Sequence, residues 1–530
     1  MKNPFKIFCE FGTVIYFLSL FMQSCAEQKQ IKADILIENG IVYNGTSSKP
    51  SKNSIAVKGD KIVYLGNKED VEIIASKVID ASGFIVSPGF IDPHTHADRD
   101  LNKPETSHNK PFLYQGVTTV AVGNDGSSFF PLTKYKALYS SQGIGTNVVP
   151  LVGHGTVREQ VMGKSDKQAT PKEIEEMQNL VQQEMKAGAF GISTGLFYAP
   201  GSYSNTDEVI ALAQTAAAYE GIYDTHLRDE SSYTVGLLSS IEEAIQVGRE
   251  AKLPIHISHI KCLGVDVWNE SRTIVNMIEK AQKEGVEITA NQYPYDASAT
   301  GLLAAVIPRW AESGGKDSLF IRYEDQKLKE KILIGIKKNI KRRGGAEKLL
   351  IVKSDDEKYV GKNVLEIYNM LNLVPEVAIM EILKSGYVRV ASFNMTKEDI
   401  LTFMKQDWVV TGSDGNTGHP RKYGSFPRKF HTYVSQEKVL DTAGFINRST
   451  AKTAEIFRIE KRGRLEEGYF ADIIIFDPKT FKDKANYTDA FQLSEGLIYS
   501  FVNGKPAIEN GTYTNKLNGK VLEKQLPKQD

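Results

Sequence analysis

The middle of the chain alternates short apolar segments with polar helical stretches, and this pattern constrains the fold more than any other feature. Segments such as TTVAVG, FGIST, IYDTHL and IHISHI are separated by stretches such as PKEIEEMQNLVQQEMKAG. Repeated β/α units of this kind place parallel strands inside a layer of helices. The pattern predicts an α/β fold with a (β/α)8 TIM-like barrel over residues 88–455.

The two ends of the chain are rich in β-like runs instead. ADILIENGIVYNG and SIAVKGDKIVYLG hold short runs between Gly and Asn turn signals, and similar runs return in GRLEEGYFADIIIFDP and YSFVNGKPAIENGTY. Neither region has a helical period. We expect residues 33–87 and 456–515 to build one small β-sandwich domain from both chain ends.

A more charged, helical region interrupts the alternation over residues 309–397. It includes the basic run KKNIKRRGGAEK at residues 337–348. Such a run is typical of a solvated helix face, and a role in steering an anionic substrate is the alternative. We interpret the region as an insertion over the barrel mouth.

Residues 1–25 are typical of a targeting segment. Lys2 and Lys6 precede an apolar run that is too short to span a bilayer. The run ends at Cys25 and resembles a bacterial lipoprotein signal, in which the cysteine is lipidated; a cleaved secretory peptide or a signal anchor is the alternative. We therefore expect an exported protein of the periplasm or cell envelope, with membrane contact only through the lipid anchor.

Charge and cysteine content narrow the partners. The 65 basic residues balance 65 acidic ones, so nothing calls for a nucleic-acid partner and a small-molecule substrate is expected. Cys9 lies in the predicted signal and Cys25 is the candidate lipidation site, which leaves Cys262. No intramolecular disulfide is then expected.

Histidines stand at the ends of several β-like segments. In VSPGFIDPHTHAD an apolar strand leads into His94 and His96, and residues i and i+2 of a strand project from one face. His226 follows the apolar segment GIYDT, and His259 follows LPIHIS. Because catalytic groups collect at the C-terminal ends of barrel strands, these histidines predict a metal cage.

Asp414 follows another apolar segment, in the Gly-rich sequence DWVVTGSDG. A lone aspartate in this position is often a helix cap or turn residue, but the four histidines favour a ligand of the same centre. Imidazole and carboxylate ligands favour zinc or a similar divalent ion. Such an ion lowers the pKa of a bound water to about 7 and so supplies a nucleophile for hydrolysis.

The motifs together resemble the amidohydrolase superfamily and, within it, the N-acyl-D-amino-acid deacylase (D-aminoacylase) family. The resemblance covers residues 33–515 and implies one or two divalent ions at the strand-end histidines, with Asp414 as general acid/base. The implied reaction splits the linear amide of an N-acyl-D-amino acid into a carboxylate and a free D-amino acid. It rests on PGFIDPHTHAD, GVTTVAVGNDG, LVGHGTVR, GAFGISTGL, THLRDES, ISHIK, NQYPYDAS, TGSDG, HPRKYGSFPR, ADIIIFDP and FVNG.

The resemblance also implies a clamp for the α-carboxylate of the substrate. Lys261, Tyr293 and Arg421 match the clamp positions, and an arginine can hold a carboxylate through two parallel hydrogen bonds. A structural ion pair is the alternative role of Arg421. We expect residues between Ser298 and Trp310 to set the side-chain preference, and Arg309 hints at an acidic side chain.

Two further residues carry open alternatives. His154 in LVGHGTVR either orients the substrate as part of the catalytic site or is a structural histidine.

The family usually carries a metal-ligating cysteine where this chain has Asp125, after Val-Gly-Asn. We hypothesise that Asp125 still ligates and bridges two metals, with a preference shifted toward Mn2+, Fe2+ or Co2+; a turn aspartate without metal contact is the alternative. Cys262 is not expected to replace the cysteine, because its neighbour Lys261 matches the clamp and consecutive strand residues face opposite ways.

Two other functions compete with the deacylase. A cyclic-amide hydrolase of the hydantoinase or dihydroorotase kind resembles this chain in fold and first histidine pair. Those enzymes generally use a carboxylated lysine as the bridging ligand, and AFGISTGLFYAP offers none. A non-catalytic binding lipoprotein on the same scaffold is the second alternative, since fold does not guarantee function, and the intact ligand set argues against it.

Overall fold

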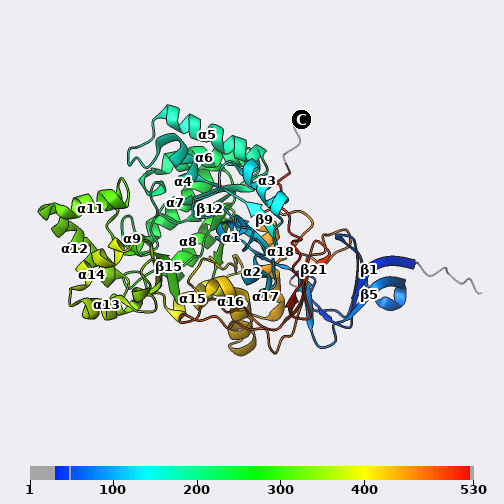
Figure 1. Ribbon diagram of the computed structural model, residues 1–530. Coiled ribbons are helices and arrows are strands. Elements are labelled where there is room, and N and C mark those ends of the chain that lie inside the picture. The colour runs from blue at the N-terminus through cyan, green and yellow to red at the C-terminus, as the bar shows by residue number, and fades with distance from the viewer. Residues whose placement is uncertain (1–29, 47–48, 526–530) are drawn as a thin grey trace, which may run out of the picture.

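A computed structural model describes residues 30–46 and 49–525 of the chain. The predicted targeting segment and its lipidation site, Cys25, lie outside the described residues. Within them, no helix has both the length and the apolar character needed to cross a bilayer. Figure 1 shows the barrel in the middle of the molecule, the β-sandwich at one end and a helical layer at the other.

The barrel strands run parallel and are almost entirely buried, as expected for strands with helices outside and side chains packed inside. Their hydrogen-bonded ladders form two sheets, β7–β8–β9 and β10–β11–β12–β13–β14–β18. The strands are β7 (Phe90–Asp92), β8 (Val117–Val122), β9 (Asn147–Pro150), β10 (Val152–Gly153), β11 (Gly191–Gly195), β12 (Ile222–His226), β13 (Ile255–Ile257), β14 (Ile288–Gln292) and β18 (Val409–Thr411).

The ladders do not close the barrel along its length, but its first and last strands meet at one point. The backbone N–H of Asp414 donates to the carbonyl of His94 (2.9 Å), and that of His96 donates to the carbonyl of Gly415 (3.2 Å). Both contacts lie just beyond the carboxyl ends of β7 and β18. The backbone that joins these strands therefore carries the predicted site residues.

Helices cover the outside of the barrel with apolar faces. The start of α5 shows why these sequences form helices, because Thr170 and Glu173 make a capping box and Pro171 occupies the first turn. Buried side chains such as Met177 and Val181 then pack α5 onto the core. The main barrel helices are α4 (His154–Met162), α5 (Pro171–Lys186), α6 (Thr206–Ala217), α7 (Leu237–Ala251), α8 (Ser271–Lys283), α15 (Lys397–Met404) and α17 (Thr442–Ser449).

The β-sandwich contains strands from both chain ends, which confirms the prediction. One sheet has the order β4–β3–β1–β5 and the other β2–β6–β19–β20–β21–β22, and residues such as Ile55 and Ile473 fill the core between them. The strands are β1 (Gln30–Glu38), β2 (Ile41–Val42), β3 (Ser54–Lys58), β4 (Lys61–Gly66), β5 (Glu72–Asp80), β6 (Ile85–Pro88), β19 (Ile473–Phe476), β20 (Leu497–Val502), β21 (Lys505–Glu509) and β22 (Thr512–Tyr513).

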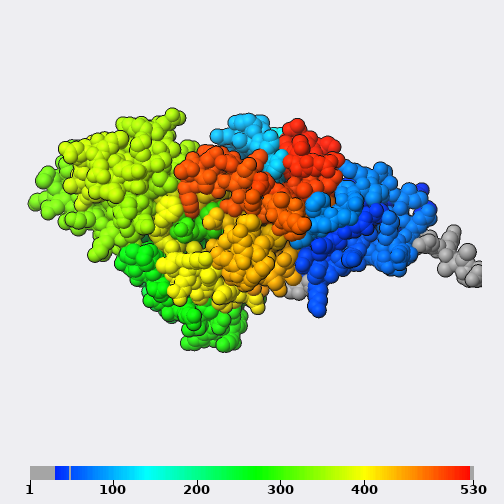
Figure 2. Space-filling model, turned by 90° about the horizontal axis from the view of Figure 1, so that it is seen from below, coloured from blue at the N-terminus to red at the C-terminus, as the bar shows by residue number. Residues whose placement is uncertain are grey.

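A layer of helices on a small antiparallel sheet follows β14 in the chain. Figure 2 shows this layer and the N-terminal strands at opposite ends of the molecule. The sheet has the order β15–β17–β16, and its own apolar core includes Ile336 and Ile351. The elements are β15 (Ala297–Gly301), α9 (Leu302–Val306), α10 (Arg309–Glu312), α11 (Lys316–Glu324), α12 (Gln326–Arg342), β16 (Leu349–Ser354), α13 (Val364–Leu371), α14 (Pro375–Lys384) and β17 (Val388–Phe393).

The basic run at the end of α12 is only partly a solvated face. Lys337, Lys338 and Lys341 are exposed, as expected. Arg342 and Arg343 are buried instead, and their guanidinium groups lie 4.3 and 5.7 Å from the centre of the Tyr233 ring. The prediction was wrong for these two arginines because tertiary contacts with the barrel cover them.

A buried polar network ties the sandwich to the barrel. The carboxylate of Asp472, which precedes β19, accepts hydrogen bonds from Arg462 and from Asn147 Nδ2 (3.1 Å) on β9. It also accepts from the backbone N–H of Asn503 (2.8 Å). Arg462 and Asp472 are both buried, so this ion pair is shielded from water.

Asp472→Ala is expected to lower the free energy of unfolding by roughly 3–5 kcal/mol, because it leaves the buried Arg462 charge without its carboxylate partner. The check is the denaturant midpoint of the purified variant. Glu455→Gln is the control, since it breaks the exposed Arg464–Glu455 pair and should cost less than about 1 kcal/mol. Equal effects of the two substitutions would contradict the role of this network.

Candidate metal centre

The first two histidines lie beyond β7 rather than on it. The strand ends at Asp92, so the predicted alternation of strand side chains does not position His94 and His96. The turn is held by Asp92 Oδ1, which accepts from the backbone N–H groups of His94 (3.2 Å) and Ser413 (3.0 Å). The two imidazole rings still converge, with centres 5.7 Å apart.

The carboxylate of Asp125 lies among all four predicted histidine ligands. Its Oδ1 is 3.3 Å from His94 Nε2, 3.5 Å from His226 Nδ1 and 3.4 Å from His259 Nε2. Its Oδ2 is 3.4 Å from His96 Nε2. The structure therefore brings Asp125 together with all four histidines, and its role as a bridging ligand stays a prediction.

Asp414 completes the cluster from the turn after β18, beside the backbone of His94. Its Oδ1 lies 3.3 Å from His96 Nε2 and 3.9 Å from His94 Nε2. Two groups of candidate ligands result, and they share Asp125. The first contains His94, His96, Asp125 and Asp414, and the second contains Asp125, His226 and His259.

The donor atoms of the cluster fit one or two divalent ions. Imidazole nitrogens and carboxylate oxygens are the ligands that zinc and neighbouring transition metals accept. His94 Nε2 and Asp125 Oδ1 are buried and make no hydrogen bond within the described part of the chain. Buried polar atoms of this kind are normally satisfied, and a metal ion satisfies both.

The electrostatics of the cluster also favour a cation. Burial lowers the pKa of His94, but the Asp125 and Asp414 carboxylates outweigh it and raise that pKa to about 9. Burial raises the pKa of Asp125, and the surrounding histidines, His94 and His226 foremost, bring it well below its ordinary value. Both carboxylates therefore stay ionised and hold positive charge beside them.

Three of the candidate ligands occupy left-handed backbone conformations. The φ angles are +56° at Asp125, +36° at His259 and +48° at Asp414. A residue other than glycine adopts this region at a cost on the order of 1–3 kcal/mol, and such residues gather at functional sites. Gly126, with φ +70°, lets the loop approach β11, because a Cβ there would lie 2.6 Å from the Gly195 backbone nitrogen. The fold thus aims these side chains at the expense of local strain.

Glu230 belongs to the site, and the sequence analysis missed it. Its Oε1 lies 2.5 Å from Lys261 Nζ and 3.0 Å from His259 Nδ1, on the side of that ring away from Asp125. Burial raises the pKa of Glu230, but Lys261 and the histidines lower it more, so the carboxylate is ionised. Its position four residues after His226, in THLRDE, was the available signal.

The strand argument about Lys261 and Cys262 was wrong. β13 ends at Ile257, so neither residue lies on a strand, and both are buried. Burial raises the pKa of the Cys262 thiol, which disfavours the thiolate form that metals bind. Lys261 Nζ, predicted to hold the substrate, is already 2.7 Å from His259 Nδ1.

Arg421 makes the ion pair that the sequence analysis gave as its alternative role. It begins α16 (Arg421–Arg428), and its Nη2 lies 2.7 Å from Asp414 Oδ2. Its Nε and Nη1 are buried without a hydrogen-bond partner in the described residues, as is the Tyr293 hydroxyl. The guanidinium lies 4.6 Å from the centre of the Tyr293 ring. These free donors border the same cavity as Ser298 and Lys261.

His154 lies beside the site rather than in the cluster. Its Nε2 is 2.8 Å from Glu208 Oε1, and Glu208 also accepts a hydrogen bond from Arg158. All three side chains are buried. This pairing satisfies one ring nitrogen of His154 within the barrel wall and gives the residue a structural partner.

Two cavities meet at the cluster. The inner cavity, about 20 Å³, borders His226, His259 and Arg421. The outer cavity, about 320 Å³, borders His96 and Asp125, and both cavities include Asp414. They lie at the carboxyl ends of the barrel strands, where catalytic groups of such barrels gather.

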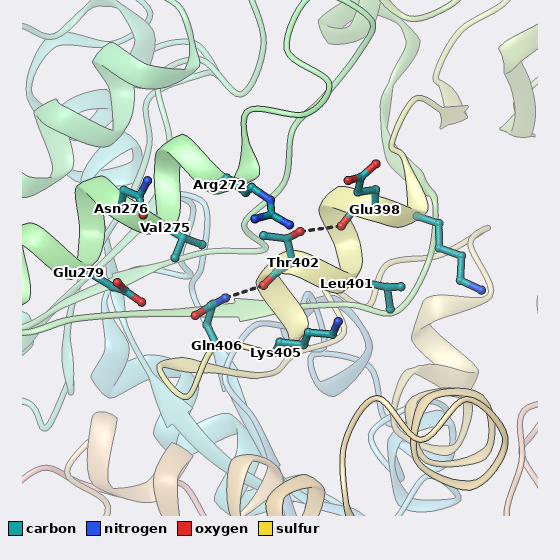
Figure 3. Close-up of a pocket in the computed structure, with 10 residues that line it drawn as sticks. Arg272, Val275, Asn276, Glu279, Glu398, Leu401, Thr402, Lys405 and Gln406 are labelled. Atoms are coloured by element: carbon teal, nitrogen blue, oxygen red, sulfur yellow. Dashed lines mark hydrogen bonds between the residues drawn. The ribbon is translucent and has the colours of Figure 1, made fainter.

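A larger groove of about 700 Å³ lies elsewhere, between α8 and α15 on the outside of the barrel. Figure 3 shows that the side chains of Thr402, and of Gln406 just beyond α15, donate hydrogen bonds to backbone carbonyls of α15. None of the candidate metal groups of the described residues borders it. We therefore assign the chemistry to the two cavities at the cluster.

A barrel with histidines and aspartates gathered at the carboxyl ends of its strands defines a metal-dependent amidohydrolase. The model of the amidohydrolase family matches residues 77–317. A D-aminoacylase from Alcaligenes xylosoxydans xylosoxydans is 29% identical, with 92% of this chain and 97% of the relative covered. An N-acyl-D-aspartate deacylase from the same organism is 30% identical, with 94% and 97% covered.

Solved structures agree with these relatives. An N-acyl-D-glutamate deacylase from Bordetella bronchiseptica, complexed with zinc and a phosphonate inhibitor, is 27% identical over 93% of this chain and 100% of that chain, with a TM-score of 0.80. A D-hydantoinase matches with a TM-score of 0.56 at 15% identity, which shows the fold alone. The chain belongs to the amidohydrolase family, and within it to the N-acyl-D-amino-acid deacylases.

Asp125→Ala is expected to lower the amount of metal that the purified protein retains, because it removes the carboxylate shared by both ligand groups. Asp125→Cys should retain metal and shift its preference toward zinc over manganese, because a thiolate is a softer ligand. The check is elemental analysis after stripping and reloading. Ser127→Ala in the same loop is the control. Unchanged metal content in Asp125→Ala would leave the turn interpretation as the correct one.

Proposed function

We propose that the protein hydrolyses the linear amide of N-acyl-D-amino acids to a carboxylate and a free D-amino acid. One observation carries the proposal: the buried, unpartnered Nε and Nη1 of Arg421 lie beside Asp414, next to the candidate metal cluster. Such donors fit the α-carboxylate that an N-acyl amino acid carries and a simple amide lacks. The preference for the D form is supported by the activities named for the relatives.

In this mechanism some residues of the chain would transfer protons, and others would hold the metal ion and the substrate in position. A bound divalent ion at His94, His96, Asp125, His226 and His259 would supply Lewis acidity and a lowered pKa for water.

Asp414 would accept the proton from the attacking water and then donate it to the nitrogen of the leaving amine. Burial raises the pKa of Asp414, and Arg421 and the histidines lower it more, so the carboxylate starts in the basic form. The free N–H groups of Arg421 and the Tyr293 hydroxyl would hold the α-carboxylate. Glu230 would fix the His259 ring by bonding its second nitrogen.

The cyclic-amide alternative has weaker support. The hydantoinase structures share the fold at 13–16% identity, and that similarity says nothing about the substrate. The segment AFGISTGLFYAP, which contains β11, has no lysine, and the residue shared by the two candidate ligand groups is Asp125. The binding-protein alternative does not explain why the candidate metal ligands converge, or why three of them have left-handed backbone conformations.

D-selective release of free amine is the direct test. The metal-stripped protein, reloaded with zinc or with manganese, should release amine from N-acetyl-D-amino acids and not from their L counterparts. An N-acetyl amine that matches a good substrate but lacks the α-carboxylate should not be hydrolysed, because the Arg421 donors then have no partner. Equal turnover with and without the carboxylate would exclude the clamp, and hydrolysis of cyclic amides alone would support the alternative.

Asp414→Asn is expected to lower kcat/KM by about 100- to 10,000-fold, because the amide can neither accept nor return the proton. The assay is run with saturating metal, so that any loss of affinity at this ligand is compensated. Asp399→Asn, a buried aspartate on α15 away from the cluster, is the matched control. Retention of more than a few per cent of kcat/KM would identify another group as the base.

We also propose that the protein is exported, on the basis of the sequence of residues 1–25. Fractionation of cells that produce the full chain tests this directly. Loss of membrane association in Cys25→Ser would support the lipid anchor, whereas activity confined to the cytoplasm would contradict export.

A further inference from the structure

One wall of the outer cavity carries positive charge that the proposed chemistry does not use. Tyr387 and Arg389, at the start of β17, line it together with Arg99 of α1 (Asp98–Leu101). Arg389 is only 6% exposed. Its Nη1 lies 3.1 Å from the Tyr387 hydroxyl and its Nη2 3.4 Å from the Ala299 carbonyl, and its Nε is buried with no partner in the described residues.

No carboxylate of the described chain makes a salt bridge with Arg389 or Arg99; the ion pairs of this region involve other residues. Asp125 and Asp414 also border the cavity, but they face the histidines and Arg421. The third acidic residue, Glu159, is exposed and lies 4.0 Å from Lys164. Neither arginine therefore has a counter-charge among the described residues. Arg99 is exposed, but Arg389 is buried, and a buried charge normally has a partner.

Arg309, unlike Arg389, has a carboxylate partner within the described part of the chain. Arg309 was expected to face an acidic substrate side chain, but its guanidinium pairs with Glu312 and lies 4.0 Å from the centre of the Phe197 ring. Its charge is thus balanced within the protein. At Tyr387, by contrast, burial raises the pKa, and Arg389 and Arg99 lower it below its ordinary value. The potential at this wall is positive.

The wall also lies next to the proposed α-carboxylate clamp. Arg421 Nη2 lies 3.4 Å from the same Ala299 carbonyl oxygen that Arg389 Nη2 contacts. The two guanidinium groups are therefore separated by a single backbone oxygen. A substrate held at Arg421 can present a second anionic group to Arg389 without leaving the site.

We propose that Arg389, Arg99 and Tyr387 form a second anion subsite, which selects N-acyl amino acids that carry a carboxylate in addition to the α-carboxylate. The inference rests on the proposed function and deepens it. The second carboxylate belongs either to the amino-acid side chain or to the far end of the acyl group, and the two are chemically equivalent at the arginines.

Two pairs of substrates separate these sources. N-acetyl-D-glutamate against N-acetyl-D-glutamine tests the side chain, and N-succinyl-D-alanine against N-butanoyl-D-alanine tests the acyl group. The charged member of one pair should have a kcat/KM about tenfold or more above its neutral partner at low salt. That ratio should fall as salt screens the charges. Ratios near one in both pairs would overturn the proposal.

Substitutions then assign the preference to the subsite. Arg389→Met should bring the charged-to-neutral ratio close to one, Arg389→Lys should keep part of it, and Tyr387→Phe provides a milder variant that retains both arginines. Lys327→Met, which removes one positive charge from exposed α12 of the same layer, is the control and should keep the ratio. Survival of the full ratio in both Arg389→Met and Arg99→Gln would contradict the assignment.

A binding measurement keeps this inference separate from the proposed function. Calorimetry with the metal-loaded protein compares glutarate, which has two carboxylates, with butyrate, which has one. Tighter binding of glutarate that is lost in Arg389→Met would support the subsite even if no N-acyl amino acid is hydrolysed. Equal binding of the two acids by the unsubstituted protein would overturn it, whatever the enzyme hydrolyses.

Discussion

The burial of the Asp125 carboxylate among four imidazole rings is the interaction on which the rest of the site depends. An ionised carboxylate in a barrel interior costs several kcal/mol unless positive charge surrounds it. The four imidazole rings come from three strand ends, those of β7, β12 and β13. Asp414 and Arg421 continue the alternation of negative and positive charge outward from the cluster. The strained backbones at Asp125, His259 and Asp414 are then tolerated because the surrounding barrel fixes them.

Buried charges behind the cluster are also paired with charges of opposite sign. Lys261 neutralises Glu230, and the Glu230 carboxylate accepts a hydrogen bond from Nδ1–H of His259, so the ring can present Nε2 toward Asp125. His154, Arg158 and Glu208 form a comparable buried group in the barrel wall. Arg389 is an exception, because no acidic residue of the described chain pairs with it. We therefore infer that the wall of the outer cavity can bind an anion.

The architecture places these groups by joining distant parts of the chain. The barrel supplies the metal ligands, and the β15–β17–β16 layer supplies Ala299, Tyr387 and Arg389 to the cavity above them. The sandwich takes no part in the cavities, and the Asp472 network ties it to β9. The site is therefore shared between the barrel, which holds the candidate metal ligands, and the layer, which lines the outer cavity.

The sequence by itself determined the barrel, the two-ended sandwich and the residue types of the metal cluster. Local periodicity reports strands and helices, and histidines at strand ends converge in any such barrel. Only the tertiary structure decided that β7 and β13 end before their histidines, that Glu230 stands behind His259, and that Arg389 rather than Arg309 lacks a counter-charge. Each of these depends on where strands stop, or on contacts between residues far apart in the chain, and local sequence patterns carry neither kind of information.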